Sequence, residues 1–339
     1  MKSYSLHAVN DLRYEELPEP ELKKNWCLVK VMACGICSSD IPRIFSKGTY
    51  NFPTIPGHEF SGIVEKVFDK ENENLIGKRV GVFPLIPCFK CDLCKQKHYE
   101  MCEHYDYLGS RRNGGFSEYV EVPVWNLIEL PKNISFETAA MLEPLSVALH
   151  AVKQSDFKSF QTAAIVGTGM IGFAASLWFK LKNAKNVTVF GRSEEKRKIA
   201  EKINGINYLS SFDNKDSFQF DVVLEAVGNP DSIIQAIKIT KPGGTLVLMG
   251  NPCCDINLPQ NIFWRILRKQ LHIVGTWNSF YEKNCDCDWS ESVKALSENK
   301  INVDLLITHK FNQDKVMDGL NLMKDSKEPY CKIMTLWNR

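Results

Sequence analysis

One segment constrains the fold of this chain more than any other, the run T-A-A-I-V-G-T-G-M-I-G at residues 162–172. A short apolar stretch leads directly into G-x-G-x-x-G, and the apolar segment F-A-A-S-L-W-F-K-L-K follows. Between a strand and a helix, such glycines permit a tight turn and let a pyrophosphate approach the helix N-terminus. The loop residues that we expect to bind a dinucleotide are Gly167, Gly169, Met170, Ile171 and Gly172.

The segments after this loop alternate between strand and helix patterns. N-V-T-V-F, F-D-V-V-L-E-A-V and G-T-L-V-L-M-G read as strands, with E-E-K-R-K-I-A-E-K-I and D-S-I-I-Q-A-I-K-I as helices between them. Strands that alternate with helices of about 10–15 residues are typical of βαβ units on a parallel sheet. Short strands with intervening glycines precede this region, and polar helices and a final strand follow it. The sequence predicts an α/β protein in which a β-rich domain is split around an inserted doubly wound domain.

The end of the second strand in the inserted domain bears on the choice of coenzyme. An NAD site usually carries Asp or Glu about 20 residues after the glycines, where it binds the ribose hydroxyls. Here that strand ends in Gly191, Arg192 and Ser193, which lack a carboxylate and can bind a 2′-phosphate. Glu194 and Glu195 follow closely and weaken this argument unless they only begin the next helix. We therefore expect NADP rather than NAD.

Length, charge and the N-terminal segment exclude several classes of protein. A chain of 339 residues is expected to form two domains of ordinary size. The net charge of +2 gives no strong field toward nucleic acid or an anionic membrane. The N-terminal run M-K-S-Y-S-L-H-A-V-N-D lacks the apolar core of a signal peptide, and no apolar run approaches ~20 residues. We expect a cytoplasmic protein whose partner is a small molecule, neither nucleic acid nor membrane.

Four of the twelve cysteines lie close together with the spacing C-x2-C-x2-C-x7-C. Thiols spaced in this way can converge on one tetrahedral ion, and four thiolates leave no position for a substrate. An iron–sulfur cluster is the alternative, but the usual proline after the fourth cysteine is missing. We therefore expect a structural zinc ion bound by Cys88, Cys91, Cys94 and Cys102.

A second, mixed set of candidate ligands is spread over the segments A-C-G-I-C-S-S-D, P-G-H-E-F-S-G and M-L-E-P-L-S-V-A-L-H-A. Together they supply a thiolate, an imidazole and one or two carboxylates, a set typical of a catalytic zinc with an open position. Such a zinc lowers the pKa of a bound alcohol, and a serine nearby can relay the alcohol proton. Cys34 is a rival to Cys37 as the thiolate ligand. The candidate catalytic residues are Cys37, Ser39, His58, Glu59 and Glu143.

By these motifs the chain resembles the zinc-dependent medium-chain dehydrogenase/reductase family over essentially its whole length. The matching segments are C-G-I-C-S-S-D, G-H-E-F-S-G, the four-cysteine segment, G-G-F-S-E-Y, E-P-L and V-G-T-G-M-I-G. Within the family it is most similar to the polyol and polyol-phosphate dehydrogenases. Glutamate at position 143, where alcohol dehydrogenases of the family carry cysteine, is the polyol-type residue.

The resemblance implies a GroES-like catalytic domain over residues 1–149 and 285–339, with a structural zinc lobe at about 84–108, and a Rossmann coenzyme domain over 150–284. It implies that Cys37, His58 and Glu143 bind the catalytic zinc, with Glu59 as an exchanging ligand or just outside the coordination shell. Two zinc ions per chain and a homodimer or homotetramer follow. Gly191 departs from the family, because polyol members commonly keep an acidic residue there.

The resemblance further implies oxidation of a secondary hydroxyl of a polyol phosphate to a keto sugar phosphate. Arg43, Arg111 and Arg112 are candidates for a phosphate site, although the last two can equally form a solvated turn or contact the coenzyme. The alternative substrates are a free polyol such as sorbitol, or another secondary or amino alcohol such as threonine.

Overall fold

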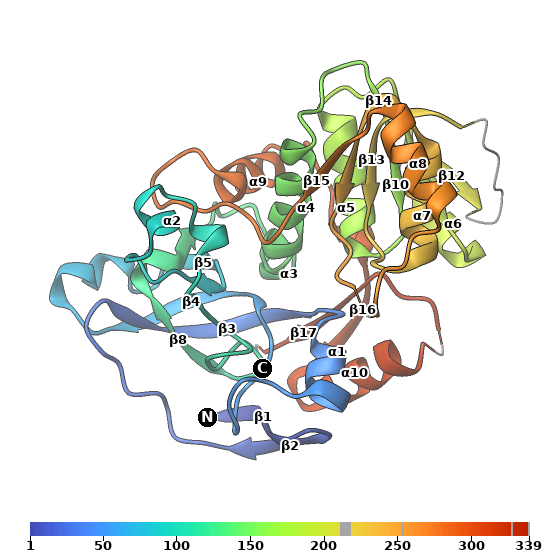
Figure 1. Cartoon of the computed structure of the whole chain (residues 1–339). Helices are drawn as coiled ribbons and strands as arrows, with labels where there is room; N and C mark the ends of the chain where they lie inside the picture. Colours follow the sequence, from blue (N-terminus) through green and yellow to red (C-terminus); the bar gives the residue numbers. More distant parts are fainter. Residues whose placement is uncertain (211–217, 253, 327, 338–339) are drawn as a thin grey trace. The chain divides into compact units, whose positions relative to one another are not determined.

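The computed structural model describes residues 1–210, 218–252, 254–326 and 328–337. The chain divides into two units, Met1–Glu143 with Phe280–Arg339, and Pro144–Ser279 (Figure 1). The inserted unit thus begins and ends a few residues earlier than the segment 150–284 expected from the sequence. Across the described ranges, no helix combines the length and apolar content needed to cross a bilayer.

The inserted unit contains a six-stranded sheet in the order β12-β11-β10-β13-β14-β15, and every pairing in it is parallel. The order reverses direction between β10 and β13, the switch point at which doubly wound sheets bind ligands. This arrangement confirms the predicted α/β class. The strands are β10 Thr162–Val166, β11 Asn186–Gly191, β12 Asn207–Ser210, β13 Phe220–Glu225, β14 Thr240–Leu248 and β15 His272–Gly275.

Helices of the same unit follow the strands as βαβ crossovers. The apolar side chains of α7 and α8 share a buried cluster with β13 and β14, which includes Val223, Ile237, Leu246 and Ile262. Asn229 begins α7 with a capping box, and Pro230 stands at its first position. The helices are α5 Met170–Leu181, α6 Glu194–Lys202, α7 Pro230–Ile239 and α8 Gln260–Lys269, and α4 Leu142–Gln154 enters the unit.

The other unit is built on a seven-stranded sheet that joins distant parts of the chain. β17 near the C-terminus lies between β16 and β3, and β4, β5 and β9 continue the sheet, with β8 also paired to β3. Only the β16–β17 pairing is parallel. The strands are β3 Trp26–Ile36, β4 Glu59–Val67, β5 Arg79–Val82, β8 Tyr119–Pro123, β9 Leu127–Glu129, β16 Ile307–Asn312 and β17 Lys332–Leu336.

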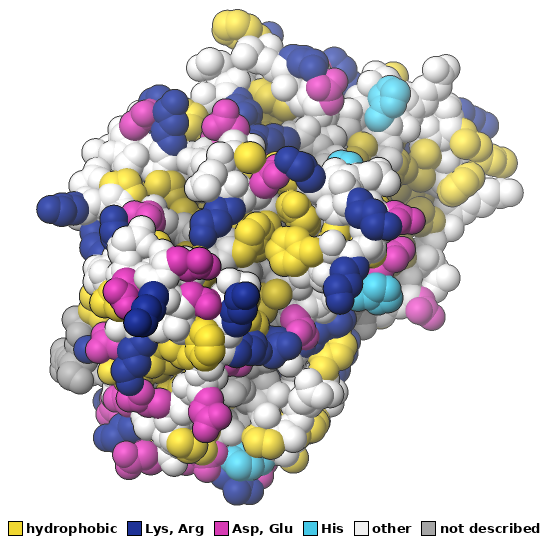
Figure 2. Space-filling model, turned by 90° about the vertical axis from the view of Figure 1, so that its left-hand side faces the viewer, with side chains coloured by type: hydrophobic (Ala, Val, Ile, Leu, Met, Phe, Trp, Pro, Cys, Tyr) yellow, Lys and Arg dark blue, Asp and Glu magenta, His cyan; other side chains and the backbone are white. Residues whose placement is uncertain are grey.

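Shorter elements complete this unit. Two small antiparallel pairs are β1 Lys2–Ala8 with β2 Asp11–Glu16, and β6 Leu85–Ile86 with β7 Asp106–Tyr107. Its helices are α1 Asp40–Pro42, α2 Asp92–Lys95, α3 Phe136–Ala140, α9 Asp288–Ser297 and α10 Val316–Asp325. Short segments of 3-10 helix or, for the first, π-helix occur at Arg43–Lys47, Lys70–Leu75, Tyr99–Met101, Val124–Asn126, Asp304–Leu306 and Gln313–Lys315. On the face shown in Figure 2, lysine and arginine are interspersed with aspartate and glutamate.

Candidate active site

Three strand ends meet at the candidate zinc site. β3 and β4 are antiparallel with Gly35 opposite Glu59, so the end of β3 lies beside the start of β4. β17 is antiparallel to β3 with Ile333 opposite Ile36, which brings the start of β17 to the same place. Cys37 follows β3, and His58 directly precedes β4. The sheet register therefore brings together residues that are far apart in the sequence.

Cys37, His58 and Glu59 form one of two groups of potential metal ligands within the described residues, with ligand atoms all within 4.8 Å of one another. His58 and Glu59 are buried, and Cys37 is half-buried. Asp40 orients this group, because its Oδ2 accepts a hydrogen bond of 2.9 Å from the Cys37 amide. The His58 Nδ1 atom is buried without a hydrogen-bond partner, and it lies 3.5 Å from Asp40 Oδ1. A carboxylate in this position fixes the orientation of a metal-binding histidine.

Behind this group, Glu59 forms a buried ion pair with Lys332, whose Nζ also donates to the Ile36 carbonyl at 3.1 Å. Gly35 makes room for the pair, since a Cβ there would lie 2.3 Å from Glu59 Oε2. Burial alone would lower the pKa of Lys332, but the charges of Glu59 and Cys37 outweigh it and raise that pKa. The charge of Lys332 thus balances the negative charge of the Glu59 carboxylate.

Glu143 is buried in the first turn of α4, and its ligand atoms do not belong to the group of three. Its Oε1 accepts a 3.3 Å hydrogen bond from the hydroxyl of Tyr107, whose ring lies 5.8 Å from that of His58. Burial, with the charge of Glu59, raises the pKa of Glu143 to about 7 against the opposing effect of His58 and Lys332. The carboxylate is therefore near the site but held by Tyr107.

The charges around the site favour a cation. Asp40, Glu59 and Glu143 bring carboxyl groups together here, and the cationic side chains that the structure describes beside them are Arg43 and Lys332. Burial by itself lowers the pKa of His58, yet Asp40 and Cys37 raise that pKa well above its usual value. A divalent ion would supply the positive charge that the site otherwise takes from a proton. The donor set therefore fits zinc, which accepts thiolate, imidazole and carboxylate ligands.

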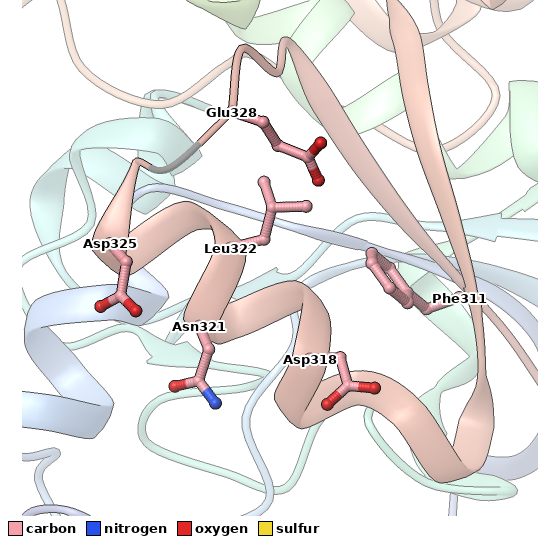
Figure 3. A pocket seen from close by; sticks show the side chains of 6 residues that line it. All are labelled: Phe311, Asp318, Asn321, Leu322, Asp325 and Glu328. Atoms are coloured by element: carbon pink, nitrogen blue, oxygen red, sulfur yellow. The ribbon is translucent and has the colours of Figure 1, made fainter.

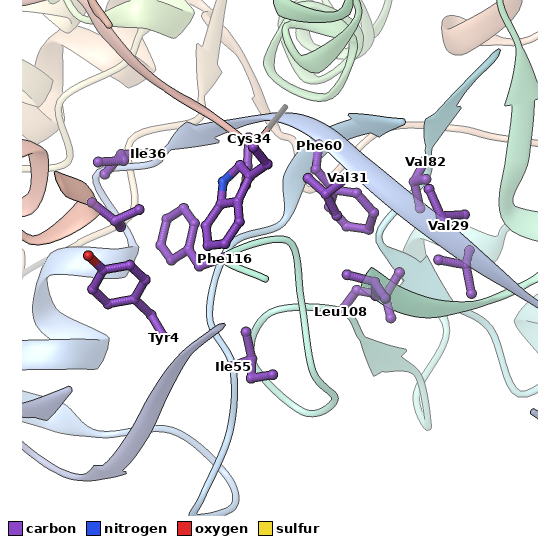
Figure 4. Packing of buried hydrophobic residues seen from close by; sticks show 14 of the residues in the cluster. Tyr4, Val29, Val31, Cys34, Ile36, Ile55, Phe60, Val82, Leu108 and Phe116 are labelled. Carbon is purple, nitrogen blue, oxygen red and sulfur yellow. The ribbon is translucent and has the colours of Figure 1, made fainter. Parts of the chain in front are cut away.

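Cys34, the rival thiol, lies in a different environment. Figure 4 shows it among labelled core residues that include Val31, Phe60 and Phe116. Its thiol is fully buried and donates weakly to the Gly35 carbonyl at 3.6 Å, and burial raises its pKa. Cys34 is a core residue, and Cys37 is the thiolate candidate.

The four cysteines of the predicted lobe converge on one point. Their sulfur atoms all lie within 4.8 Å, with 3.9 Å from Cys88 to Cys94 and from Cys91 to Cys102. A disulfide would require about 2.05 Å. A zinc tetrahedron with Zn–S bonds of ~2.3 Å has S···S edges of about 3.8 Å, close to the observed separations.

Amide groups within the lobe prepare these thiols for a cation. The amides of Cys91 and Lys90 donate to Cys88 Sγ at 3.3 and 3.4 Å and lower the pKa of Cys88 to about 6. Burial instead raises the pKa of Cys94. The amides thus favour the thiolate of Cys88, whereas burial makes Cys94 hold its proton more strongly until a cation binds.

The glycine loop has the geometry of a pyrophosphate site. Gly167 has φ +118°, and a Cβ there would lie 2.8 Å from Val227 Cγ2. Gly172 packs against the loop, because a Cβ would lie 2.1 Å from the Gly167 carbonyl oxygen. A Cβ on Gly169 would meet no protein atom within 4 Å, which leaves space for a phosphate. Met170 and Ile171 begin α5, and the start of a helix offers free backbone amides to an anion.

At the neighbouring strand end, Gly191 closes β11, Arg192 is exposed and Ser193 is the N-cap of α6. Ser193 Oγ accepts a hydrogen bond of 3.2 Å from the Lys196 amide. Glu194 and Glu195 occupy the first turn of α6, the position of a helix start.

The three arginines considered for a phosphate site are separated. Arg43 donates from Nη1 to Asp40 Oδ1 at 2.9 Å, beside the zinc candidates. Arg111 lies 4.3 Å from the ring centroids of both Tyr50 and Tyr105, and its buried Nε has no hydrogen-bond partner.

Arg112 points elsewhere. It pairs with Asp106 at 2.7 Å and lies 5.4 Å from the ring of Trp26, at the end of β3 opposite to Cys37. Arg112 therefore does not belong to the surroundings of the zinc candidates, whereas Arg43 does.

A separate cavity of about 320 Å³ lies between α10 and the end of β16 (Figure 3). Its lining residues are Phe311, Asp318, Asn321, Leu322, Asp325 and Glu328. None of these residues belongs to the two ligand groups found in the described part of the chain. The cavity therefore has no part in the candidate zinc chemistry.

Sequence reasoning missed Tyr107 and Lys332, and it used Asp40 only to favour Cys37 over Cys34, without a role of its own. Asp40 stands in the segment C-S-S-D, three residues after Cys37, so it could have been recognised from its spacing. Lys332 opens the buried strand K-I-M-T-L, where a lysine among apolar residues signals a paired charge. Tyr107 carries no such signal in the sequence.

Two family profiles match the chain. The profile described as "Alcohol dehydrogenase GroES-like domain" covers residues 23–132, and that described as "Zinc-binding dehydrogenase" covers residues 171–303. These matches identify the β-rich unit as GroES-like, as the resemblance implied.

Among characterised relatives, galactitol 1-phosphate 5-dehydrogenase of Escherichia coli K12 is 33% identical, over 89% of this chain and 92% of that protein. The crystal structure of galactitol-1-phosphate dehydrogenase from Escherichia coli is 31% identical with a TM-score of 0.91, and covers 99% of this chain and 100% of that one. Sorbitol dehydrogenase of Bacillus subtilis 168 is 26% identical, over 100% of this chain and 98% of that protein.

Two further solved structures, each 26% identical and covering 99% of this chain, contain coenzymes. A zinc-binding dehydrogenase from Sinorhizobium meliloti 1021 is bound to NADP, with a TM-score of 0.89 and 98% of that chain covered. A short chain alcohol dehydrogenase from Escherichia coli CFT073 is complexed with NADH, with a TM-score of 0.90 and 99% covered. From the profiles, the identity with the first relative and the metal-ligand geometry, we conclude that the chain belongs to the polyol branch of the zinc-type medium-chain dehydrogenases and is an NAD(P)-linked oxidoreductase.

Proposed function

We propose that this dehydrogenase oxidises a secondary hydroxyl of a polyol phosphate, such as galactitol 1-phosphate, to the keto sugar phosphate. The observation that carries this proposal is the similarity to galactitol 1-phosphate 5-dehydrogenase over 89% of the chain. Two arginines support it, because Arg43 lies beside the zinc candidates and Arg111 has a buried Nε without a partner. Either guanidinium can form charge-assisted hydrogen bonds with a phosphate.

The proposed catalytic zinc ligands are Cys37, His58 and Glu143, with Glu59 exchanging or remaining paired with Lys332. The proposed structural zinc ligands are Cys88, Cys91, Cys94 and Cys102, which gives two ions per chain. A chelator should remove the ion of the mixed site first and abolish turnover while the fold persists. One tightly bound metal per chain, or iron–sulfur absorbance, would contradict this assignment.

In the proposed reaction, a zinc ion held by Cys37, His58 and Glu143 would supply the Lewis-acid chemistry that acidifies the substrate hydroxyl, and a bound nicotinamide coenzyme would supply the hydride acceptor. The chain supplies the remaining functions. Asp40 orients Cys37 and His58, and the ion pair with Lys332 holds the Glu59 carboxylate in place. The Ser39 hydroxyl, two residues after Cys37, takes the alcohol proton toward solvent.

Substrate profiling tests the phosphate. Galactitol 1-phosphate and galactitol are compared in kcat/KM for the wild type, Arg43→Gln, Arg111→Gln and the control Arg112→Gln. One charge-assisted contact of ~1.5–3 kcal/mol favours the phosphate ester by about one to two orders of magnitude. Arg43→Gln or Arg111→Gln should reduce this preference, whereas Arg112→Gln should keep it because Arg112 pairs with Asp106.

Equal activity on the two forms would favour the second candidate, a dehydrogenase of a free polyol such as sorbitol. The similarity to the sorbitol dehydrogenase of Bacillus subtilis supports that candidate. Amino alcohols such as threonine belong in the same panel.

For the coenzyme we propose NADP over NAD, since β11 ends in Gly191 without a carboxylate and Arg192 beside it is exposed. Titration of both coenzymes tests this preference. A cytoplasmic location is supported by the described cysteines, none of which forms a disulfide.

A homodimer or homotetramer is also proposed. β15 is an edge strand, and it and its neighbourhood expose large apolar side chains that a second copy would cover: Phe263, Trp264, Leu267, Ile273 and Trp277. Light scattering measures the subunit number, and a monomer at micromolar concentration would contradict the proposal. The interspersed charges on the face in Figure 2 favour a small-molecule substrate over nucleic acid or a membrane surface.

A further inference from the structure

The space next to Gly191, at the end of β11, is filled by Tyr208 of the neighbouring strand β12. Val189 of β11 pairs with Tyr208, and the tyrosine side chain reaches along the sheet toward the strand end. A Cβ on Gly191 would lie 2.3 Å from the Tyr208 hydroxyl oxygen and 2.7 Å from Thr168 Cγ2. Any larger residue at position 191 must therefore displace the tyrosine.

Tyr208 also holds the turn that follows Gly191. Its hydroxyl donates to the Ser193 carbonyl at 2.7 Å and accepts from the Ser193 amide at 3.2 Å. The Arg197 guanidinium lies 5.0 Å from the ring centroid, and its Nε donates to Glu194 at 3.0 Å. One side chain thus fixes both backbone groups of Ser193 and contacts the first turns of α6.

This turn borders the coenzyme loop. β11 pairs with β10, and the Gly167 amide donates to the Phe190 carbonyl at 3.0 Å. A dinucleotide on this loop extends its adenosine ribose to the end of β11, where an NAD site carries its carboxylate. Gly191 to Ser193 therefore lie where the 2′-hydroxyl or 2′-phosphate must be recognised.

We propose that Tyr208 is the positioning residue that sets coenzyme specificity. It excludes a carboxylate at position 191, and it holds Arg192 and Ser193 in the conformation that receives a 2′-phosphate. This inference rests on the proposed preference for NADP. Tyr208 acts through the turn and not by contact with the coenzyme, so its effect should differ between NADPH and NADH.

The first test removes only the hydroxyl of Tyr208. Tyr208→Phe frees both backbone groups of Ser193, and we expect the Kd for NADPH to rise about 5–10-fold, while that for NADH changes less than about twofold. Asn207→Ala is the matched control, because Asn207 is the preceding residue on β12 and is exposed. Titration of reduced-coenzyme fluorescence measures both constants. An equal loss for both coenzymes would make Tyr208 merely structural and overturn the inference.

The second test introduces a carboxylate at position 191, first with Tyr208 in place and then with a smaller residue at position 208. Gly191→Asp alone should lower the unfolding temperature of the coenzyme-free protein, because an aspartate side chain at position 191 cannot share the space with Tyr208. Gly191→Asp with Tyr208→Val should recover most of that loss and bind NADH better than NADPH. If the single variant does not fold, folding of the double variant is the supporting result.

Two outcomes overturn the inference: Gly191→Asp unfolds at the wild-type temperature, or the double variant is no more stable than the single one. A wild-type preference for NADH would overturn the NADP proposal alone. The thermal comparison distinguishes the two failures, because it uses no coenzyme.

Discussion

The residues of the candidate zinc site lie at the end of β3, at the start of β4, in α4 and in β17, so they span the sequence from Cys37 to Lys332. The coenzyme loop, in contrast, lies within the single strand–turn–helix β10–α5 of the inserted unit. Long-range assembly makes the first site depend on sheet register, whereas the second is defined by local backbone geometry. A mutation in the first should therefore affect chemistry and folding over a wider region.

One ion pair from each unit can be compared by how much of its side chains is exposed. Glu59 and Lys332 have side chains that are 1% and 3% exposed, whereas Asp221 and Lys241 are 17% and 43% exposed. A buried charge that loses its partner is costly, and a partly solvated one is screened by water. Breaking the buried pair should therefore lower the free energy of unfolding strongly. Breaking the partly exposed pair of the inserted unit should lower it only slightly, and in a way that depends on pH.

The largest expected effect concerns the two neighbouring thiols at the end of β3. Cys37→Ser removes a proposed zinc ligand and should lower kcat/KM by about 10³-fold or more, because Lewis-acid stabilisation is worth several kcal/mol. Cys34→Ser is the matched control, since Cys34 lies in the core and outside the ligand group. Steady-state kinetics and metal analysis of both variants measure the difference. Loss of zinc and activity in Cys34→Ser alone would reverse the assignment.

Next in size is the loss of Lys332. Lys332→Met leaves the Glu59 carboxylate buried without its partner, and the free energy of unfolding should fall by about 3–5 kcal/mol. Urea denaturation measures this. Lys78→Met, at an exposed pair with Glu129, should change the same quantity by less than about 1 kcal/mol.

A second substitution sharpens this result. Glu59→Gln added to Lys332→Met removes the unpaired charge and should recover much of the lost stability. A double variant as unstable as Lys332→Met would mean that packing of the lysine, not its charge, stabilises the end of the sheet.

Third is the four-cysteine lobe, where Cys94→Ser should lower the free energy of unfolding by about 3 kcal/mol because zinc binding contributes to folding. Trp125 offers a local signal, since its ring lies 5.0 Å from Phe89 and 5.2 Å from Tyr99 of the lobe. The fluorescence of Trp125 is isolated by subtracting the spectrum of a Trp125→Phe variant. This fluorescence should change in Cys94→Ser. The exposed Cys285→Ser is the control, and an unchanged Cys94→Ser would contradict a structural role for the lobe.

The parts that could be predicted from the sequence are those that depend on near neighbours. The loop Gly167–Gly172 and the cysteines from Cys88 to Cys102 are defined by spacing over a few residues. Backbone conformation and tetrahedral convergence follow from such spacing without knowledge of the sheet. The α/β class followed from the alternation of strand and helix patterns.

The remaining contacts depend on strand order, which no local pattern encodes. The partner of Glu59 is Lys332, and this pairing exists only because β17 is inserted beside β3. Arg111 and Arg112 are adjacent in sequence, yet only the fold reveals that the second pairs with Asp106 near Trp26. Likewise, the filling of the space at Gly191 by Tyr208 follows from the pairing of β11 with β12.

The smallest expected effect lies in the coenzyme unit and depends on pH. Burial alone would raise the pKa of Asp221, but hydrogen bonds from Lys241 and Thr162 lower it to about 2. The unfolded value is about 3.9, so this carboxylate stabilises the fold above pH ~4 and loses that contribution as the pH falls toward 2. The shift corresponds to at most ~2.5 kcal/mol, and the exposure of Lys241 reduces it to about 1–2 kcal/mol.

Asp221→Asn should therefore lower the free energy of unfolding by about 1–2 kcal/mol at pH 7 and by clearly less at pH 3. The measured quantity is the difference between variant and wild type in urea, so that any loss of zinc in acid affects both proteins equally. Glu201→Gln, an exposed carboxylate on α6, is the control and should change stability by less than about 0.5 kcal/mol at either pH. A difference for Asp221→Asn that is the same at pH 7 and pH 3 would mean that the side chain stabilises the unit by shape and neutral hydrogen bonds. The charge of Asp221 would then contribute little to stability. The two ion pairs would differ in their dependence on charge by more than their exposed fractions suggest.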